Sequence, residues 1–362
     1  MHIGLGFGFG KGDPALSDHD TYVGETSIAL KAEERGYDSV WAVEHHFNDY
    51  AFCPDNLLWL SHIAARTSKI KLGTGAVILP WNTQPIRVAE KLLMLDHLSE
   101  GRVIFGMGRG LSRKEYAPFG VDLETSRDRF DEASKFVVDA IESGYAESEG
   151  PYYPQERVEL RPRPFASWQG RMYTGAGTPE SAAVGIANGA GLMSFVIRPV
   201  DNYLPAWTDY RDKFEAKWNR TAPPISINLN MYTDEDSGRA NDRIREYVNR
   251  FYAENINHYE FNGQHFGSTK GYEGYAKISE KLNEMGFEKS AEQYAATALG
   301  GSPQEIVDKI IWMKEQVGDI SIIAAAAFGG MPYEYADKSV ALFAEKVIPV
   351  VKQHFAAQPV SV

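Results

Sequence analysis

The sequence contains a single cysteine, Cys53, among its 362 residues. One thiol cannot form an internal disulfide or a cysteine-rich zinc site, so both means of stabilisation are excluded. The chain also lacks an uninterrupted run of about 18 apolar residues, the length that a membrane-spanning helix needs. Basic residues are in deficit, since 37 lysines and arginines face 49 aspartates and glutamates, a net charge of −12. Such a chain is poorly suited to binding nucleic acid or an anionic membrane, which require clustered positive charge.

No targeting signal is visible at the amino terminus. Residues 1–10 are apolar but carry neither the charged segment nor the cleavage site of a secretory leader. We therefore expect these residues to form a buried strand that starts the fold. The single cysteine fits a reducing compartment, and the expected location is the cytoplasm.

Short apolar runs alternate with amphipathic helical segments along the whole chain. This order predicts β-α-β units and a parallel sheet covered by helices. About eight such units favour an α/β fold of the closed (β/α)8 TIM-barrel type over an open sheet. No change of composition marks a second domain, so residues 1–362 are predicted to form one barrel domain. The expected strands are residues 3–9, 39–43, 70–79, 103–107, 172–175, 191–197, 225–232 and 320–328.

Two segments interrupt the alternation. Residues 145–169 are rich in proline, which predicts an extended excursion before the fifth strand. Residues 255–298 form a long insertion between the seventh and eighth strands and are rich in aromatic, glycine and polar residues. Long segments of this kind usually build a lid or a wall of the active site. We predict that this insertion is an active-site lid.

Three titratable residues, Glu44, His45 and His46, follow the second strand without a break. Barrel active sites lie at the carboxyl ends of the strands, and histidine suits acid–base chemistry near neutral pH. Strand alternation would place Glu44 and His46 on one side and His45 on the other. The same residues fit a purely structural His–Glu pair equally well. A metal site is a weaker alternative, because no supporting set of ligands is visible at the other strand ends.

Glycines occur inside the third expected strand and at the end of the fourth. Gly73 and Gly75 would let a ligand or another backbone approach closely, although tight barrel packing is the simpler explanation on this strand alone. At the end of the fourth strand, Arg109 lies between Gly108 and Gly110. Its guanidinium suits bidentate binding of phosphate or carboxylate. We favour an anion-binding role for Arg109 over a surface ion pair.

The loop after the fifth strand is a second candidate anion site. It consists of the small residues Gly175, Ala176, Gly177 and Thr178 and leads into a helix at Pro179. Such a loop exposes backbone N–H groups and the positive end of the helix dipole. Many loops of this type are simple glycine-rich connections, and that alternative stays open.

Several of these motifs occur in the same order in one known family. Together they resemble the bacterial-luciferase-like, flavin-dependent monooxygenases over most of the chain, most weakly over residues 236–298. Each motif is short, but their order and spacing together are specific. The matching segments are WAVEHHF at 41–47, IKLGTGA at 70–76, LDHLSEGR at 95–102, GMGRG at 106–110 and TPES at 178–181.

The resemblance implies a (β/α)8 barrel that binds flavin mononucleotide (FMN). In this family the reduced FMN comes from a separate flavin reductase and reacts with O2, and the resulting flavin 4a-peroxide oxygenates the substrate. By motif match, His45 takes the place of the catalytic histidine, and Glu44 or His46 would fix its tautomer.

The resemblance also assigns the flavin pocket. Arg109 and Arg127 match the arginines that bind the FMN phosphate, and the Gly75–Ala76 bond matches a non-proline cis peptide against the flavin ring. Glu115 falls where luciferase has an aspartate beside the ring. The expected cofactor-binding residues are Gly75, Ala76, Gly108, Arg109, Glu115, Arg127, Gly175, Ala176, Gly177 and Thr178.

Two departures separate the chain from luciferase. Gly108 stands where luciferase has a reactive cysteine, and Thr174 and Gly175 replace its acidic and hydroxyl phosphate contacts. We therefore expect oxygenation of a small or medium apolar substrate rather than light emission from an aldehyde. The alternatives are a deazaflavin-dependent oxidoreductase of the same superfamily, a non-catalytic flavin-binding homologue and a metal-dependent barrel hydrolase. The family's habit implies a homodimer, and no metal, nucleic acid or membrane partner is expected.

Overall fold

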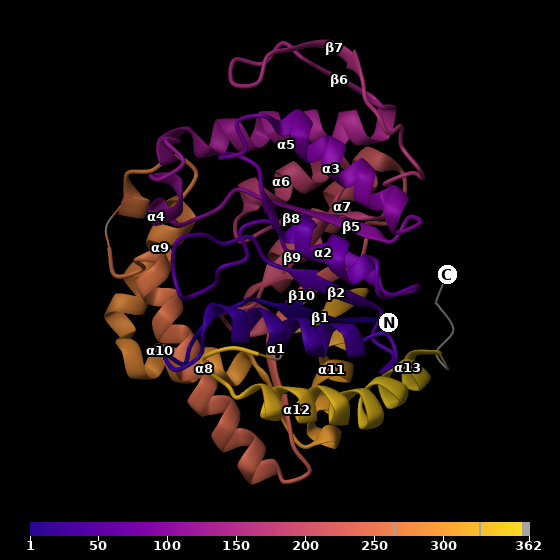
Figure 1. Cartoon of the computed structure of the whole chain (residues 1–362). Helices are drawn as coiled ribbons and strands as arrows, with labels where there is room; N and C mark the ends of the chain where they lie inside the picture. Colours follow the sequence, from indigo (N-terminus) through magenta and orange to yellow (C-terminus); the bar gives the residue numbers. More distant parts are fainter. Residues whose placement is uncertain (264, 326, 357–362) are drawn as a thin grey trace.

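The computed structural model describes residues 1–263, 265–325 and 327–356, so that Gln264, Ala326 and residues 357–362 lie outside the described residues. Eight parallel strands close into a barrel, because β10 pairs with both β9 and β12 (Figure 1). The predicted α/β barrel is confirmed. Its strands are β1 (His2–Phe7), β2 (Ser39–Ala42), β3 (Lys71–Thr74), β5 (Val103–Gly108), β8 (Met172–Gly175), β9 (Gly191–Phe195), β10 (Ile225–Thr233) and β12 (Ile320–Ala325).

The third predicted strand is interrupted. Residues 70–79 were expected to run continuously, but β3 ends at Thr74 and β4 (Val77–Ile78) resumes the pairing with β5. Between the two lies the peptide bond Gly75–Ala76, which is cis as the family resemblance implies. The amide of Asn56 donates to the carbonyls of Ala42 (3.2 Å) and Ala76 (3.0 Å), and so ties this break to the end of β2.

Helices surround the barrel because their apolar faces pack on the strands. Ser302 and Glu305 form a reciprocal capping box at the start of α11, and Thr178 caps α6. Within the described residues, no helix is long and apolar enough to cross a lipid bilayer. The surrounding helices are α1 (Asp18–Lys31), α2 (Asn56–Ala64), α3 (Pro85–Leu98), α5 (Ser126–Ser143), α6 (Pro179–Asn188), α7 (Leu204–Trp218), α8 (Ser237–Tyr259), α11 (Pro303–Val317), α12 (Tyr333–Lys346) and α13 (Ile348–Ala356).

The two predicted interruptions take different forms. The proline-rich segment contains the antiparallel hairpin of β6 (Tyr145–Ser148) and β7 (Gln155–Glu159), which extends beyond α5 in Figure 1. The insertion is mainly helical. It begins in the last turns of α8 and contains the short helix η3 (His265–Gly267), α9 (Glu273–Met285) and α10 (Phe287–Thr297). It leads into β11 (Leu299–Gly301), which pairs with β10.

Glu25 of α1 is a buried carboxyl group in the apolar interior, only 1% exposed. It accepts a hydrogen bond from the backbone N–H of Phe9, just after β1, at 2.9 Å. Burial raises the pKa of Glu25 to about 8, although hydrogen bonds from the backbone of Phe9 and Gly8 act in the opposite direction. The group is therefore protonated in the folded protein at pH 7, whereas an unfolded chain releases this proton near pH 4.5.

This difference predicts that Glu25 makes the fold less stable as pH rises. The pKa of the carboxyl group is higher in the folded state, so its contribution is fully present below about pH 4.5 and is lost as pH approaches 8. Glu25→Gln, which is always neutral, should become more stable than the parent between pH 5.5 and 8.5, by on the order of 2 kcal/mol. Urea unfolding of both proteins at several pH values measures this gap, and a gap that does not change with pH would contradict the assignment.

Candidate active site

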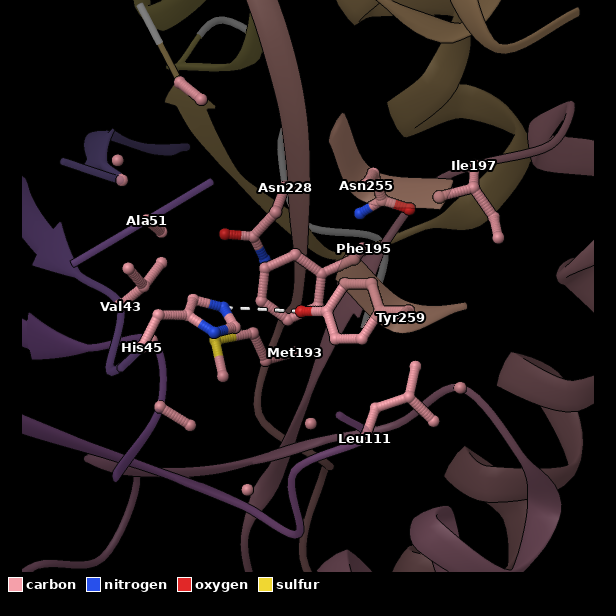
Figure 2. Close-up of a pocket in the computed structure, with 18 of the residues that line it drawn as sticks. Val43, His45, Ala51, Leu111, Met193, Phe195, Ile197, Asn228, Asn255 and Tyr259 are labelled. Atoms are coloured by element: carbon pink, nitrogen blue, oxygen red, sulfur yellow. Dashed lines mark hydrogen bonds between the residues drawn. The ribbon is translucent and has the colours of Figure 1, made fainter. Parts of the chain in front are cut away.

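A cavity of about 330 Å3 lies at the carboxyl ends of the barrel strands. Its lining is mainly apolar and aromatic and includes Phe261, Tyr275 and Tyr294 of the insertion. A concave apolar site with a few polar groups is typical of a small-molecule pocket, and this end of a barrel is where active sites occur. Figure 2 shows Val43, His45, Met193, Phe195, Asn228 and Tyr259 grouped around this cavity.

His45 lies in the loop after β2, and its ring reaches the cavity. Its Nδ1 is 2.9 Å from Oε1 of Glu115, a residue of the short helix α4 (Arg113–Tyr116). Its Nε2 is 3.3 Å from the hydroxyl of Tyr259, as the dashed line in Figure 2 marks. The carboxylate at Nδ1 favours the tautomer with a proton on that nitrogen, which leaves Nε2 to exchange protons on the cavity side.

The prediction that Glu44 or His46 fixes this tautomer is wrong. β2 ends at Ala42, so the strand alternation expected for these residues does not reach them; in the loop, His46 Nε2 lies 3.3 Å from Glu44 Oε1. Glu44 also accepts hydrogen bonds from the backbone N–H of Ile78 (3.0 Å) and from Nε1 of Trp81 (2.7 Å). The Glu44–His46 pair therefore holds the loop after β2 against β4.

Glu115 is a buried carboxylate with several donors around it, and only 1% of it is exposed. Its Oε1 accepts from His45 and from the backbone N–H of His46 at 2.8 Å. Its Oε2 lies 3.5 Å from Nε2 of His258. Burial alone would raise the pKa of Glu115, but the charge of His45 and the hydrogen bonds from both histidines outweigh it, and the pKa falls well below its usual range.

Sequence reasoning missed His258 and Tyr259, at the end of α8. The ring of His258 stacks on Tyr50 with centroids 4.7 Å apart and meets the ring of His45 edge-on at 5.3 Å. Burial lowers the pKa of His258, against the opposing influence of Glu115. The only signal in the sequence was the aromatic character of the insertion, which does not indicate which ring faces the barrel.

A metal ion could also bind to His45, Glu115 and His258. One potential donor atom of each residue lies within 4.8 Å of the donor atoms of the other two. The sequence showed no such set, since the three residues come from separate segments. In the structure, hydrogen bonding already gives His45 and Glu115 a partner in each other. His45 and Glu115 therefore form a hydrogen-bonded histidine–carboxylate pair, whereas both ring nitrogens of His258 have no hydrogen-bond partner within the described residues.

Two buried arginines carry the predicted anion-binding role, and one of them, Arg127, is also ion-paired with Asp131 at 2.8 Å. Arg109 and Arg127 are buried, 7% and 8% exposed, and within the described chain the Nη1 atom of each has no hydrogen-bond partner. The guanidinium of Arg109 lies 3.7 Å above the ring of Tyr272, in the insertion. A buried cationic N–H without a partner is costly, so these atoms favour an anionic ligand.

The loop that starts α6 adjoins the same arginines. Arg127 donates to the carbonyl of Glu180, in the first turn of α6, at 3.0 Å. Gly175, Ala176 and Gly177 line the cavity. A Cβ added at Gly175 would meet only the Met107 carbonyl, at 3.9 Å, so this side of the loop is open. The structure thus brings together two predicted anion sites, Arg109 and the loop, with Arg127, which the resemblance had assigned.

Small residues make the floor between the anion site and His45. Gly75, Ala76 and Gly108 line the cavity, and Gly75–Ala76 is the cis peptide described above. A Cβ added at Gly108 would lie 2.8 Å from the Ile78 side chain and 3.1 Å from Ala76. The close packing at Gly108 therefore leaves little room for the cysteine that luciferase carries at this position. A flat floor next to an anion site fits a planar ring with a phosphate tail.

The chain belongs to the luciferase-like monooxygenase family, whose model matches residues 4–319. It is 24% identical, over 346 residues, to the alkanal monooxygenase alpha chain of Photorhabdus luminescens, and the match covers 94% of each chain. A monooxygenase from Streptomyces bottropensis superposes with a TM-score of 0.80 at 28% identity, covering 96% of this chain and 99% of the other. The protein is thus a flavin-dependent monooxygenase by family.

Two more distant structures share the fold. The oxygenating constituent of a Pseudomonas putida 3,6-diketocamphane monooxygenase, solved with FMN, has a TM-score of 0.72 at 20% identity and covers 96% of this chain and 98% of its own. An F420-dependent secondary alcohol dehydrogenase has a TM-score of 0.71 at 18% identity, with 97% and 98% covered. The same barrel therefore serves two kinds of flavin-type cofactor, and the fold alone does not choose between them.

The anion site predicts a loss of FMN affinity when Arg109 is removed. Losing a charge-assisted hydrogen bond costs about 1.5–3 kcal/mol, so Arg109→Ala should bind FMN roughly ten- to a hundredfold more weakly. Arg109→Lys should recover part of the loss, because an ammonium lacks the planar fork. Fluorescence titration measures both variants, with Arg87→Ala on the exposed face of α3 as the control.

Riboflavin, which has no phosphate, provides the matching ligand control. Its affinity should be the same in the parent and in Arg109→Ala. If FMN binds both proteins equally, or if riboflavin loses as much affinity as FMN, Arg109 does not bind the phosphate.

Proposed function

We propose that this protein is a two-component monooxygenase that uses reduced FMN, supplied by a separate flavin reductase, to oxygenate a small or medium apolar organic compound. The observation that carries the proposal is the buried guanidinium of Arg109, whose Nη1 has no hydrogen-bond partner within the described residues, next to an open helix-start loop. It lies in the same cavity as His45 and Glu115. An anionic cofactor with a planar ring satisfies both features at once.

The residues of the cavity divide into those for the phosphate and those for the ring. Arg109, Arg127 and the loop of Gly175–Thr178 would hold the phosphate by charge and by the N–H groups of the α6 terminus. Gly75, Ala76 and Gly108 would lie against the ring. When bound, reduced FMN supplies the electrons that activate O2 for insertion into the substrate.

His45 would handle the proton of the reaction. Glu115 holds Nδ1–H at 2.9 Å, and this directs Nε2 to the cavity, where it can donate or accept a proton. The hydroxyl of Tyr259, 3.3 Å from Nε2, is the adjacent group through which the proton could pass. Developing negative charge near this imidazole would be stabilised by hydrogen bonding in a site with little water.

The rest of the cavity would bind the substrate. Leu111, Phe195, Ile197 and Phe251 line it together with the aromatic residues of the insertion. The amide of Asn228 is a polar group on this side that could orient the substrate, as Figure 2 shows. Aldehydes and cyclic ketones are the first compounds to test, because the names of two similar proteins specify such substrates.

The insertion would act as a lid over the bound cofactor. Tyr272 stacks on Arg109, and a Cβ at Gly271 would lie 2.8 Å from Nη1 of Arg109, so the insertion backbone reaches the phosphate site. Gly271 has a φ of 77°, a conformation that favours glycine. Covering the phosphate site in this way would exclude water, which otherwise diverts oxygen to hydrogen peroxide.

A homodimer is the assembly that we propose. Leu58 of α2 is 72% exposed, and Met94 and Leu98 of α3 are 57% and 58% exposed. Helices α2 and α3 follow one another around the barrel, so these apolar side chains can contribute to one contact face. We further propose that the protein acts in the cytoplasm, where a reductase can supply reduced FMN.

A deazaflavin-dependent oxidoreductase is the alternative favoured by the shared fold of the F420-dependent neighbour. Hydride transfer to a carbonyl compound would then occur without O2. Anaerobic turnover with a reduced deazaflavin and none with reduced FMN would support it. Elemental analysis tests the metal-dependent alternative, for which His45, Glu115 and His258 would be the ligands.

The role of His45 predicts a specific kinetic defect. His45→Ala should keep FMN affinity within a few fold but lower product formation by roughly 10²–10⁴-fold, while hydrogen peroxide rises. The assay uses NADH, a flavin reductase and a panel of aldehydes and cyclic ketones. Normal turnover would move the catalytic role to His46 or to no histidine, and an unfolded variant would identify His45 as a structural residue.

The lid predicts where a protease cuts. Limited proteolysis of the protein without flavin should cleave first within residues 255–298, and FMN should slow that cleavage. Tyr272→Ala, which removes the contact with Arg109, should speed the cut and weaken the protection by FMN. First cleavage elsewhere, at a rate that FMN does not change, would contradict the proposal.

A further inference from the structure

The two oxygens of Glu115 have different neighbours. Oε1 is held by the ring of His45 at 2.9 Å and by the backbone N–H of His46 at 2.8 Å. Oε2 lies 3.5 Å from Nε2 of His258. His258 therefore faces the oxygen that His45 does not use, and the two imidazoles, whose rings meet edge-on at 5.3 Å, share one buried carboxylate.

The helix that carries His258 is fastened to the helix that carries Glu115. Ser112 donates to the carbonyl of His258 at 3.2 Å, and Lys114 donates to the carbonyl of Asn257 at 2.8 Å. Arg113 forms a two-pronged ion pair with Glu260 at 2.6 and 2.8 Å. These contacts set the distance between Glu115 and His258 without using either side chain.

The ring of His258 is packed and is not part of the cavity wall. It is 3% exposed and stacks on Tyr50 with an angle of 14° between the rings. Among the described residues that line the cavity, His45, Glu115 and Tyr50 are present and His258 is not. His258 can therefore influence the reaction only through its neighbours.

We propose that His258 is a positioning residue: its Nε2, 3.5 Å from Oε2 of Glu115 and without a hydrogen-bond partner among the described residues, restrains the second oxygen of Glu115 and thereby the ring of His45. This inference rests on the proposed function for its effect on turnover. A glutamate carboxylate that has a contact at one oxygen can rotate about its Cγ–Cδ bond, whereas contacts at both oxygens restrict that rotation. The restraint keeps Oε1 in line with Nδ1 of His45 and keeps Nε2 directed at the cavity.

The position of His258 also ties the site to the insertion. α8 ends at Tyr259, and the insertion continues directly from it. Placing α8 thus places both the support of Glu115, through His258, and the hydroxyl that meets Nε2 of His45, through Tyr259. A segment outside the barrel, the end of α8, consequently fixes the position of the proposed acid–base residue His45.

Two substitutions separate the contact of His258 Nε2 with Glu115 from the packing of the His258 ring on Tyr50. His258→Phe keeps an aromatic ring against Tyr50 but has no donor for Glu115. His258→Gln loses the ring but keeps an N–H of similar reach. His265→Phe, at another histidine of the insertion, is the matched control. If His258→Phe does not fold, His258→Asn, whose shorter amide falls short of Glu115, replaces it.

The first readout is the Nδ1 proton of His45, observed by NMR in the protein without flavin. A proton held by a buried carboxylate gives a low-field signal that exchanges slowly. We expect this signal in the parent, in His258→Gln and in His265→Phe, and we expect its loss in His258→Phe. An unchanged signal in His258→Phe would overturn the inference whatever the activity is.

The second readout is turnover with the reductase and the substrate panel. His258→Phe should lower kcat by about ten- to a hundredfold, with KM and FMN affinity within about twofold, and His258→Gln should restore most of kcat. A rise in KM with an unchanged kcat would overturn the inference. If the parent itself shows no FMN-dependent oxygenation while the NMR signal responds as expected, the proposed function fails and the positioning role stands. If the parent binds a stoichiometric metal ion and His258→Phe does not, the positioning role is overturned, because the partner of Glu115 would then be the metal.

Discussion

The burial of one carboxylate, that of Glu115, organises the mouth of this barrel. A charge removed from water is stable only when donors surround it, and here the donors come from the loop after β2 and from the end of α8. The helix α4 that carries Glu115 must therefore stay between those two segments. The ring of His45, the insertion and the wall of the cavity all take their positions from this requirement.

The same mouth contains the buried guanidinium of Arg109, for which the described residues supply no ion pair, beside Arg127, which is ion-paired with Asp131. Arg109 and Arg127 are buried, and each keeps an unused N–H. A histidine–carboxylate pair that is internally satisfied and an arginine pair that is not suit different tasks. We propose that the first exchanges protons and that the second binds an anion. The small-residue floor at Gly75 and Gly108 joins them, so that one extended ligand can reach both.

Much of the fold could be predicted from the sequence, because each β-α unit buries its own apolar run. The alternation was sufficient for eight strands. The first, sixth and eighth strands end two or three residues earlier than predicted, and the third is interrupted by the cis bond after Gly75. The insertion was recognised by its length. Its helices were not predicted, because the glycines before α9 and between α9 and α10 suggested a loop, although within the two helices only Gly274 is a glycine.

Residues of the candidate site could be predicted only where the residues next to them in the sequence indicated a role. Arg109 was distinguished by its flanking glycines, and His45 by its place after a strand. The partner of His45 could not be found in this way, because Glu115 comes from a different β-α unit and the nearby Glu44 was the obvious choice. His258 was hidden among the aromatic residues of an insertion whose packing no periodic pattern reveals.

The central claim is that this cavity binds reduced FMN and directs its reaction with O2. The most direct measurement is an anaerobic titration with reduced FMN, followed by a pulse of O2 in a stopped-flow spectrometer. The account predicts saturable binding at one FMN per chain. It also predicts reoxidation that differs from that of free FMN, with an absorbance phase that belongs to neither the reduced nor the oxidised flavin. Reoxidation at the rate of free FMN with immediate stoichiometric hydrogen peroxide, or binding of a reduced deazaflavin but not of reduced FMN, would contradict it.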